Sequence, residues 1–214
     1  MTMPTDTGLL TLAQWLSPAY PIGAFAYSHG LEQAAAAGWV RDAASLEAWL
    51  TDCLTEGSGR ADAIWLRLAH AAADPAEIDA RARAFAASGE RLREGLRQGT
   101  AFAEVTNAVW GFDLPPLMLP VAVGAAARRA GLEVEPVLLM YLHGFLSNLV
   151  AAAQRLAPIG QTGGQRVLAA LHPACADVVR ATRDADDTDI YSTAFLSDVA
   201  AMRHETLGTR IFQS

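Results

Sequence analysis

The chain has 214 residues, of which 52% are hydrophobic and 18% charged, and its net charge is −7. This length fits one or two domains and is enough to bury a substantial core. The acidic balance disfavours nucleic acid as a partner, because phosphate binding needs clustered basic residues. All 16 basic residues are arginine. The chain therefore lacks the lysine of a Walker-type phosphate loop, and we expect no nucleotide hydrolysis by that route.

The sequence predicts a cytoplasmic protein that does not associate with a membrane. Residues 1–8 lack the basic start and long apolar core of an export signal. The apolar tracts at 117–127 and 137–142 contain proline or give way to polar residues before the length of a membrane span. Cys53 and Cys175 are too few for a disulfide framework.

Apolar residues recur at helical spacing along the chain, and no segment alternates as a strand does. We predict an all-α fold, a helical bundle of about eight to ten helices. Residues 1–7 are expected to be a disordered N-terminus, and residues 8–214 a single all-helical domain that ends in a docking tail. One helix is predicted over 25–37, and another is expected to begin at Pro173.

Gly95 and Gly99 lie on one side of the helix predicted over 90–109. Small residues there would let a neighbouring helix approach closely. Together with the apolar content, this favours a homodimer formed through a helix face.

Metal binding and catalysis find little support in residue spacing. His172 and Cys175 are two possible metal ligands, with Asp177 nearby. A tight site needs three or four convergent ligands, so a helix start with a buried thiol is favoured. His204-Glu205 begins like a zinc-protease motif, but Gly208 stands where the second histidine is required. We predict no catalytic residues, no metal ligands and no cofactor.

The segment from Pro21 to Glu32 is unusual for a connection between helices. Proline and glycine break the helical pattern, and aromatic residues follow at once as Phe25, Tyr27 and His29. A plain linker would be short and polar. This segment is therefore expected to dock on another surface.

Three motifs in order resemble the UreF family of urease accessory proteins. They are Pro-Ile-Gly-Ala-Phe with Tyr-Ser-His-Gly-Leu-Glu at 21–32, Pro-Ile-Gly-Gln-Thr-Gly-Gly-Gln at 158–165, and the ending at 202–214. The resemblance covers most of the chain from about residue 9, although residues 60–110 match only in helical character. The departures are Ile211, where leucine is usual, and Gly208, where many members carry an aromatic residue.

The resemblance implies an all-helical, dimeric protein that is not an enzyme. It implies binding to UreD (also called UreH), joint recruitment of the GTPase UreG, and engagement of the urease apoprotein, with GTP hydrolysis coupled to nickel insertion. Phe25 and Arg210 match family positions implicated in recruiting the GTPase, and the tail is implied to become ordered when UreD binds. The expected partner-binding residues are Pro21, Gly23, Phe25, Tyr27, His29, Glu32, Met202, His204, Glu205, Arg210, Ile211, Phe212 and Ser214.

A second hypothesis belongs to a different class. In this hypothesis the aromatic segment forms one wall of a pocket built around Tyr20, Phe25, Tyr27 and His29. The chain would then be a helical small-molecule-binding protein or enzyme.

Overall fold

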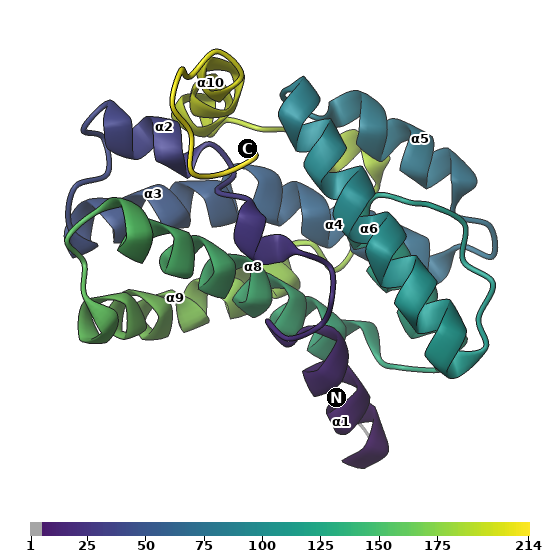
Figure 1. The fold of residues 1–214 in the computed structure, drawn as a ribbon. Coiled ribbons are helices and arrows are strands. Elements are labelled where there is room, and N and C mark those ends of the chain that lie inside the picture. Colours follow the sequence, from purple (N-terminus) through teal and green to yellow (C-terminus); the bar gives the residue numbers. More distant parts are fainter. Residues whose placement is uncertain (1–5) are drawn as a thin grey trace.

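The computed structural model describes residues 6–214, and all regular structure among them is helical. This confirms the predicted all-α fold (Figure 1). Residues 1–5 of the expected disordered N-terminus lie outside the described residues, whereas residues 6 and 7 already belong to the first helix. The elements are α1 (Asp6–Trp15), η1 (Ala24–Ala26), α2 (Leu31–Ala36), α3 (Ala43–Thr55), α4 (Ser58–Ala71), α5 (Ala76–Phe85), α6 (Gly89–Trp110), α7 (Leu119–Arg129), α8 (Val134–Leu156), α9 (Gln161–Ala181), η2 (Asp187–Asp189) and α10 (Phe195–His204).

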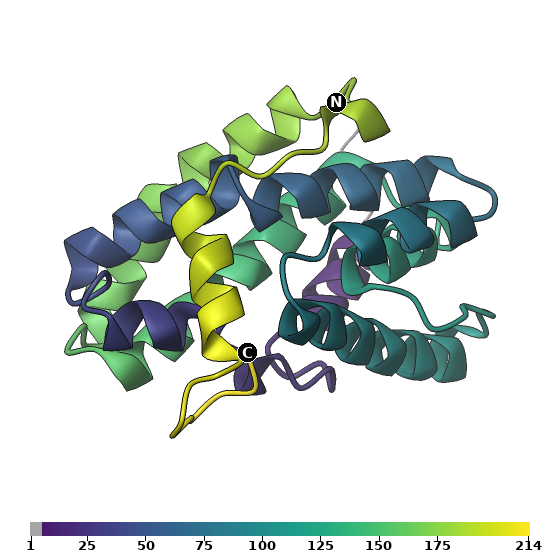
Figure 2. The ribbon, with the colours of Figure 1, turned by 90° about the horizontal axis from the view of Figure 1, so that it is seen from above.

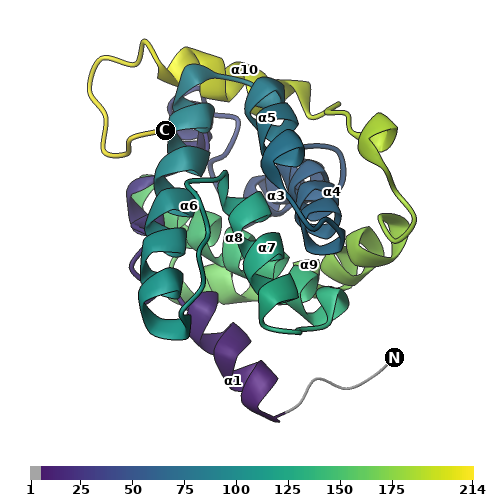
Figure 3. The same cartoon turned by 90° about the vertical axis from the view of Figure 1, so that its right-hand side faces the viewer.

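The core forms where α4 and α7 meet, flanked by α6 and α8 (Figure 3). Helix α7 is rich in small residues, and Ala122 and Ala126 are fully buried. Gly124 of α7 faces the backbone of Leu66 in α4, where a Cβ atom would collide with the Leu66 carbonyl. Small side chains thus allow the two helices to pack closely at the centre of the bundle.

Helix α8 is a core helix. By length and apolar composition it is the one helix within residues 6–214 that could cross a membrane. However, 50% of its most apolar 18-residue window is buried inside the fold. Leu138, Leu142 and Leu146 recur at a spacing of four and are completely buried, as expected of a helix that lines a protein core.

Two predicted helix boundaries are wrong. The helix expected over 25–37 begins only at Leu31, because His29 and Gly30 have φ values of 59° and 78° and cannot continue a right-handed helix. Pro173 does not start a new helix but lies inside α9. The packing of α9 along α3 and α8 holds it continuous through the proline.

The glycines of α6 serve packing within the chain. A Cβ at Gly95 would meet the Met118 side chain, and one at Gly99 would meet the backbone of Leu117. Both glycines therefore face the segment that leads into α7. This face is not free for a second chain, and the reason inferred from the sequence for a homodimer through these glycines is wrong.

Candidate partner-binding surface

The segment between α1 and α2 is shaped by residues with positive φ. Gly23, with φ of 70°, precedes the short helix η1, and Tyr27 then returns to extended backbone. Gly30 begins α2 against α10, and a Cβ there would lie 2.7 Å from the Ala201 nitrogen. Glycine at this position combines a left-handed conformation with a close backbone approach. The local sequence thus turns the chain so that residues 24–30 lie along α8 and α10.

The C-terminal tail, residues 205–214, packs against this segment. It leaves α10, loops outward and returns, so that its end lies between α2 and α6 (Figures 1 and 2). The Gln213 amide donates to the Ala26 carbonyl at 2.8 Å, and the Ser28 amide donates to the Ser214 carbonyl at 2.9 Å. The two motifs most distant in the sequence are therefore adjacent in the structure.

Glu32 anchors the tail. Its carboxylate accepts the Ile211 amide at 2.7 Å and the Phe212 amide at 2.9 Å, and His204 Nε2 lies 3.2 Å from it. Glu32 is only 7% exposed. A buried carboxylate needs such charge-assisted hydrogen bonds to offset its loss of hydration.

Two further buried carboxylates complete the anchor, and both lie on α6. Glu90 accepts from Arg210 and lies 2.6 Å from His204 Nδ1. Glu94 accepts from the Ser214 hydroxyl and forms an ion pair with Arg91. Burial alone would raise the pKa of Glu94, but the Arg91 charge and the hydrogen bonds from His29 and Arg91 together outweigh this effect and hold the pKa below its usual range. We call Glu32, Glu90 and Glu94 the carboxylate anchor.

The tail is packed in the isolated chain, contrary to the expectation that it is free until a partner binds. Phe212 is 4% exposed, with the guanidinium of Arg155 over its ring at 4.4 Å. Arg155 also donates to the Phe25 carbonyl at 3.2 Å, so it contacts both motifs at once. The tail is held because buried carboxylates of α2 and α6 accept its hydrogen-bond donors.

The predicted partner-binding residues divide by exposure. Those that reach the surface are Pro21, Phe25, Met202, Glu205, Arg210 and Ile211, with Gly23 half-buried. Those that are buried are Tyr27, His29, Glu32, His204, Phe212 and Ser214. In this conformation the second group cannot touch a partner directly. Its members hold the first group in place.

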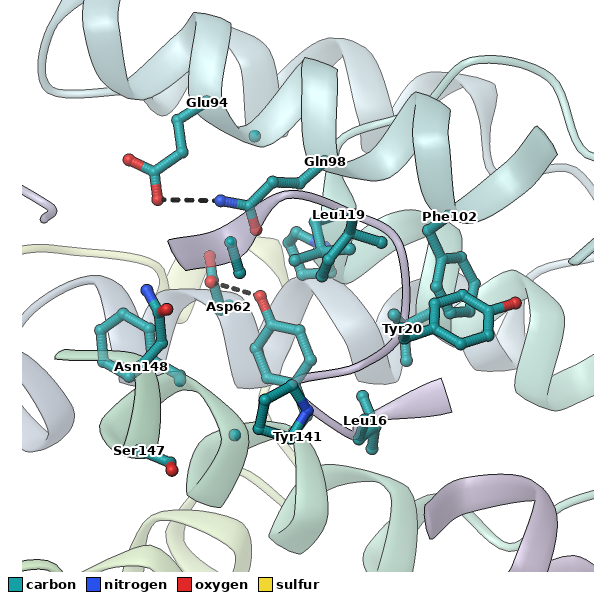
Figure 4. Close-up of a pocket in the computed structure, with 18 of the residues that line it drawn as sticks. Leu16, Tyr20, Asp62, Glu94, Gln98, Phe102, Leu119, Tyr141, Ser147 and Asn148 are labelled. Carbon is teal, nitrogen blue, oxygen red and sulfur yellow. Dashed lines mark hydrogen bonds between the residues drawn. The ribbon is translucent and has the colours of Figure 1, made fainter. Parts of the chain in front are cut away.

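A cavity of about 230 Å³ lies beneath the aromatic segment (Figure 4). Tyr20, Phe25 and His29 line it, as the second hypothesis expected, whereas Tyr27 is not among its lining residues. Asp62 and Tyr141 also face it, with the Tyr141 hydroxyl donating to Asp62 at 2.7 Å. Burial raises the pKa of Asp62 to about 6, although the Tyr141 hydrogen bond partly offsets this effect.

His29 lies between this cavity and a second one of about 270 Å³. Its Nε2 is 2.6 Å from the Ser58 hydroxyl, and its Nδ1 is 3.8 Å from Glu94. Burial lowers the pKa of His29, and the Arg91 charge lowers it further. The imidazole therefore favours the neutral form and serves as a buried link between α4 and α6.

Sequence reasoning missed the residues that anchor the tail from α6. Glu90, Glu94 and Gln98 are spaced by four residues, in register with Phe102 and Thr106, and all five are buried. When polar residues continue an apolar stripe on the same face of a helix, the sequence indicates that these polar side chains are buried and bind buried partners.

Comparison with known proteins gives the family. The UreF family model matches residues 40–172 of the chain. A urease accessory protein UreF of Cereibacter sphaeroides (strain KD131 / KCTC 12085) is 53% identical over 209 residues, covering 98% of this chain and all of the relative. The chain belongs to the UreF family.

Other UreF relatives match over similar lengths. The UreF of Roseobacter denitrificans is 49% identical across 99% of this chain and 96% of the relative, and that of Ruegeria pomeroyi is 48% identical across the whole of both. The full-length matches include both the 21–32 motif and the tail. Members of the UreF family are accessory proteins rather than enzymes, so the hypothesis of an enzyme with an aromatic pocket is not supported.

Proposed function

We propose that this chain acts in urease maturation as a non-catalytic adaptor. Together with UreD (UreH) it recruits the GTPase UreG to the urease apoprotein, where GTP hydrolysis is coupled to nickel insertion. This assembly takes place in the cytoplasm, as the sequence predicts. The convergence of the 21–32 motif and the C-terminal tail on one surface is the observation that carries the proposal.

That surface has the character of a protein–protein interface. Phe25 is 73% exposed and Ile211 60%, and Met202 on α10 is 52% exposed. Exposed large apolar side chains of this kind mark interaction sites when they gather on one surface. The hydrogen bond from the Gln213 amide to the Ala26 carbonyl holds the segments that carry Ile211 and Phe25 side by side. A rigid exposed aromatic residue is a typical interface anchor because its packing restricts few rotatable bonds.

Arg210 adds a charge to this surface. Its side chain is 38% exposed and one of its nitrogens contacts Glu90. The ion pair to Glu90 holds one guanidinium nitrogen, and the partly exposed group has further donors for a carboxylate on UreG. We assign Phe25 and Arg210 to UreG recruitment, and the exposed faces of α10 and the tail, including Met202, to UreD.

Co-purification of UreD and UreG with single variants tests this assignment. Phe25→Ala and Arg210→Ala should each retain UreD and lose UreG. If Arg210 meets a buried acid on UreG, its loss costs roughly 2–5 kcal/mol of binding. The matched controls are Val109→Ala, at an exposed apolar residue near the C-terminal end of α6, and Arg129→Ala.

Glu90→Gln distinguishes a direct contact of Arg210 with UreG from a role of Arg210 in positioning the tail. This change removes the ion pair to Arg210 but leaves the arginine present. If Arg210 contacts UreG directly, Glu90→Gln should weaken UreG capture less than Arg210→Ala does. If Arg210→Ala recruits UreG normally, or if it loses UreD together with UreG, the assignment of these residues to UreG recruitment is wrong.

The homodimer is proposed from the family resemblance alone, because Gly95 and Gly99 already pack against residues 117–119 of the same chain. Light scattering tests the homodimer at a chain concentration of roughly tens of micromolar, which is high enough to populate weak assemblies. A monomer at that concentration contradicts the proposal.

A further inference from the structure

Two histidines from different helices meet on the surface of the bundle. His143 lies in α8 and His172 in α9, both side chains are exposed, and their ring centroids are 5.4 Å apart at an interplanar angle of 55°. The two helices pack along each other (Figure 1). The backbone positions that hold this pair are therefore set by the packing of the core.

The ring nitrogens of this pair are free, in contrast to those of the other three histidines. His29 bonds Ser58, His70 lies 2.8 Å from the Leu132 carbonyl, and His204 lies between two carboxylates. Neither His143 nor His172 forms a hydrogen bond to a protein group within residues 6–214. Both imidazoles thus keep their lone pairs available.

The spacing of the rings suits one shared metal ion. A metal held at about 2 Å by a ring nitrogen lies roughly 3.2 Å from the ring centroid. Two rings on one ion, at coordination angles of about 90–120°, then have centroids roughly 4.5–5.5 Å apart. The observed 5.4 Å falls in this range.

The surroundings favour two protein ligands and no more. Within residues 6–214 there is no group of three or more histidine, cysteine or acidic side chains placed to share a metal ion. Cys175, one turn along α9 from His172, is buried, and burial raises the pKa of its thiol to about 11. It does not supply a thiolate at neutral pH.

The protonation state also favours binding. Partial burial lowers the pKa of His143, and the nearby His172 lowers it further. A neutral imidazole is the form that binds metals, so protons compete less for this side chain at neutral pH.

We propose that His143 and His172 supply the two protein ligands of a surface site for a first-row divalent transition metal that prefers imidazole, namely Cu²⁺, Ni²⁺ or Zn²⁺. Water fills the remaining positions. Affinity follows the usual order, with Cu²⁺ bound most tightly. The site does not depend on the role proposed for the chain in urease maturation, and it uses neither the carboxylate anchor nor the tail.

Titration of the untagged full chain with Ni²⁺ alone and with Cu²⁺ alone tests the site. Calorimetry should show one ion per chain, and the electron paramagnetic resonance of bound Cu²⁺ should show coupling to two imidazole nitrogens. His143→Gln and His172→Gln should each weaken binding about tenfold or more, because chelation makes the second contact intramolecular. Affinity should fall as the pH is lowered, because a protonated imidazole nitrogen cannot bind the metal.

His70→Gln is the matched control, since it removes a histidine that already contacts the Leu132 carbonyl. It should leave metal affinity unchanged. Circular dichroism should show that His143→Gln and His172→Gln stay folded, because both side chains are exposed. Three results would overturn the proposal. They are an unchanged metal affinity in the His143→Gln/His172→Gln double variant, a stoichiometry of one ion per two chains in the unmodified protein, and no binding of Cu²⁺.

Discussion

Replacing Glu32 by alanine should release the tail while leaving the bundle folded. The carboxylate accepts two tail amides, those of Ile211 at 2.7 Å and Phe212 at 2.9 Å. Hydrogen bonds to a charged group contribute roughly 1.5–3 kcal/mol each, so Glu32→Ala should lower the free energy of tail opening by about 3–6 kcal/mol. This is local opening, since most of the core lies in helices that the tail does not hold.

Native-state amide hydrogen exchange measures the effect directly. The amides of Phe212 and Ser28, the second bonded to the Ser214 carbonyl, should exchange about 100-fold to 10,000-fold faster in the variant. Core amides such as that of Leu142 should change far less. Glu32→Gln keeps the size of the side chain and one carbonyl oxygen, and should give an intermediate rate. Glu104→Ala, at an exposed glutamate of α6, is the matched control.

Two results would refute this reasoning. Unchanged exchange at Phe212 in Glu32→Ala would show that Phe212 packing under Arg155, rather than the carboxylate, holds the tail. Equal acceleration of tail and core amides would show that the tail is part of the cooperative core.

Two further predictions concern stability. Burial raises the pKa of Asp62 in the folded chain to about 6, so the protonated carboxyl stabilises the fold below the unfolded pKa of about 4, and this stabilisation is lost as the pH rises through about 6. Asp62→Asn should remove about 3 kcal/mol of this pH dependence of the free energy of unfolding. Urea unfolding from pH 4 to 8 measures it. Gly30→Ala should destabilise the chain more than Gly38→Ala by urea unfolding. Both have positive φ, but only Gly30 faces the Ala201 backbone. Equal losses would contradict the role given to that contact.

The helices that could be predicted are those whose signals are local. In α3 the stripe of Leu46, Leu50 and Cys53 is buried as its spacing indicates. The Asp42 side chain accepts the Ser45 amide at 2.8 Å in a capping box, and an aspartate just before an apolar stripe is itself a sequence signal for a helix start. Periodicity and capping depend only on neighbours within one or two turns, so one sequence is enough to read them.

The place where the tail docks could not be predicted in the same way. Glu32 and Ile211 are 179 residues apart, and nothing near Glu32 in the sequence indicates a partner for its carboxylate. An isolated glutamate in a short helix is usually solvated. Its burial follows only when α2, α6 and α10 are assembled, because each contributes one member of the cluster around His204.

The family model and the motifs describe different parts of the molecule. The UreF family model matches residues 40–172, which build most of the bundle, whereas the 21–32 motif and the tail lie outside the matched range. Yet the tail also binds Glu90 and Glu94, which belong to the bundle, and Glu94 lies 3.8 Å from His29 of the motif. The proposed partner surface is therefore not an appendage that could be transferred by its two motifs alone. The surface also requires an α6 whose buried face carries carboxylates where an ordinary core helix would carry leucines. The two ends of the chain therefore depend on α6, a helix in the part of the sequence that resembles the family only in helical character.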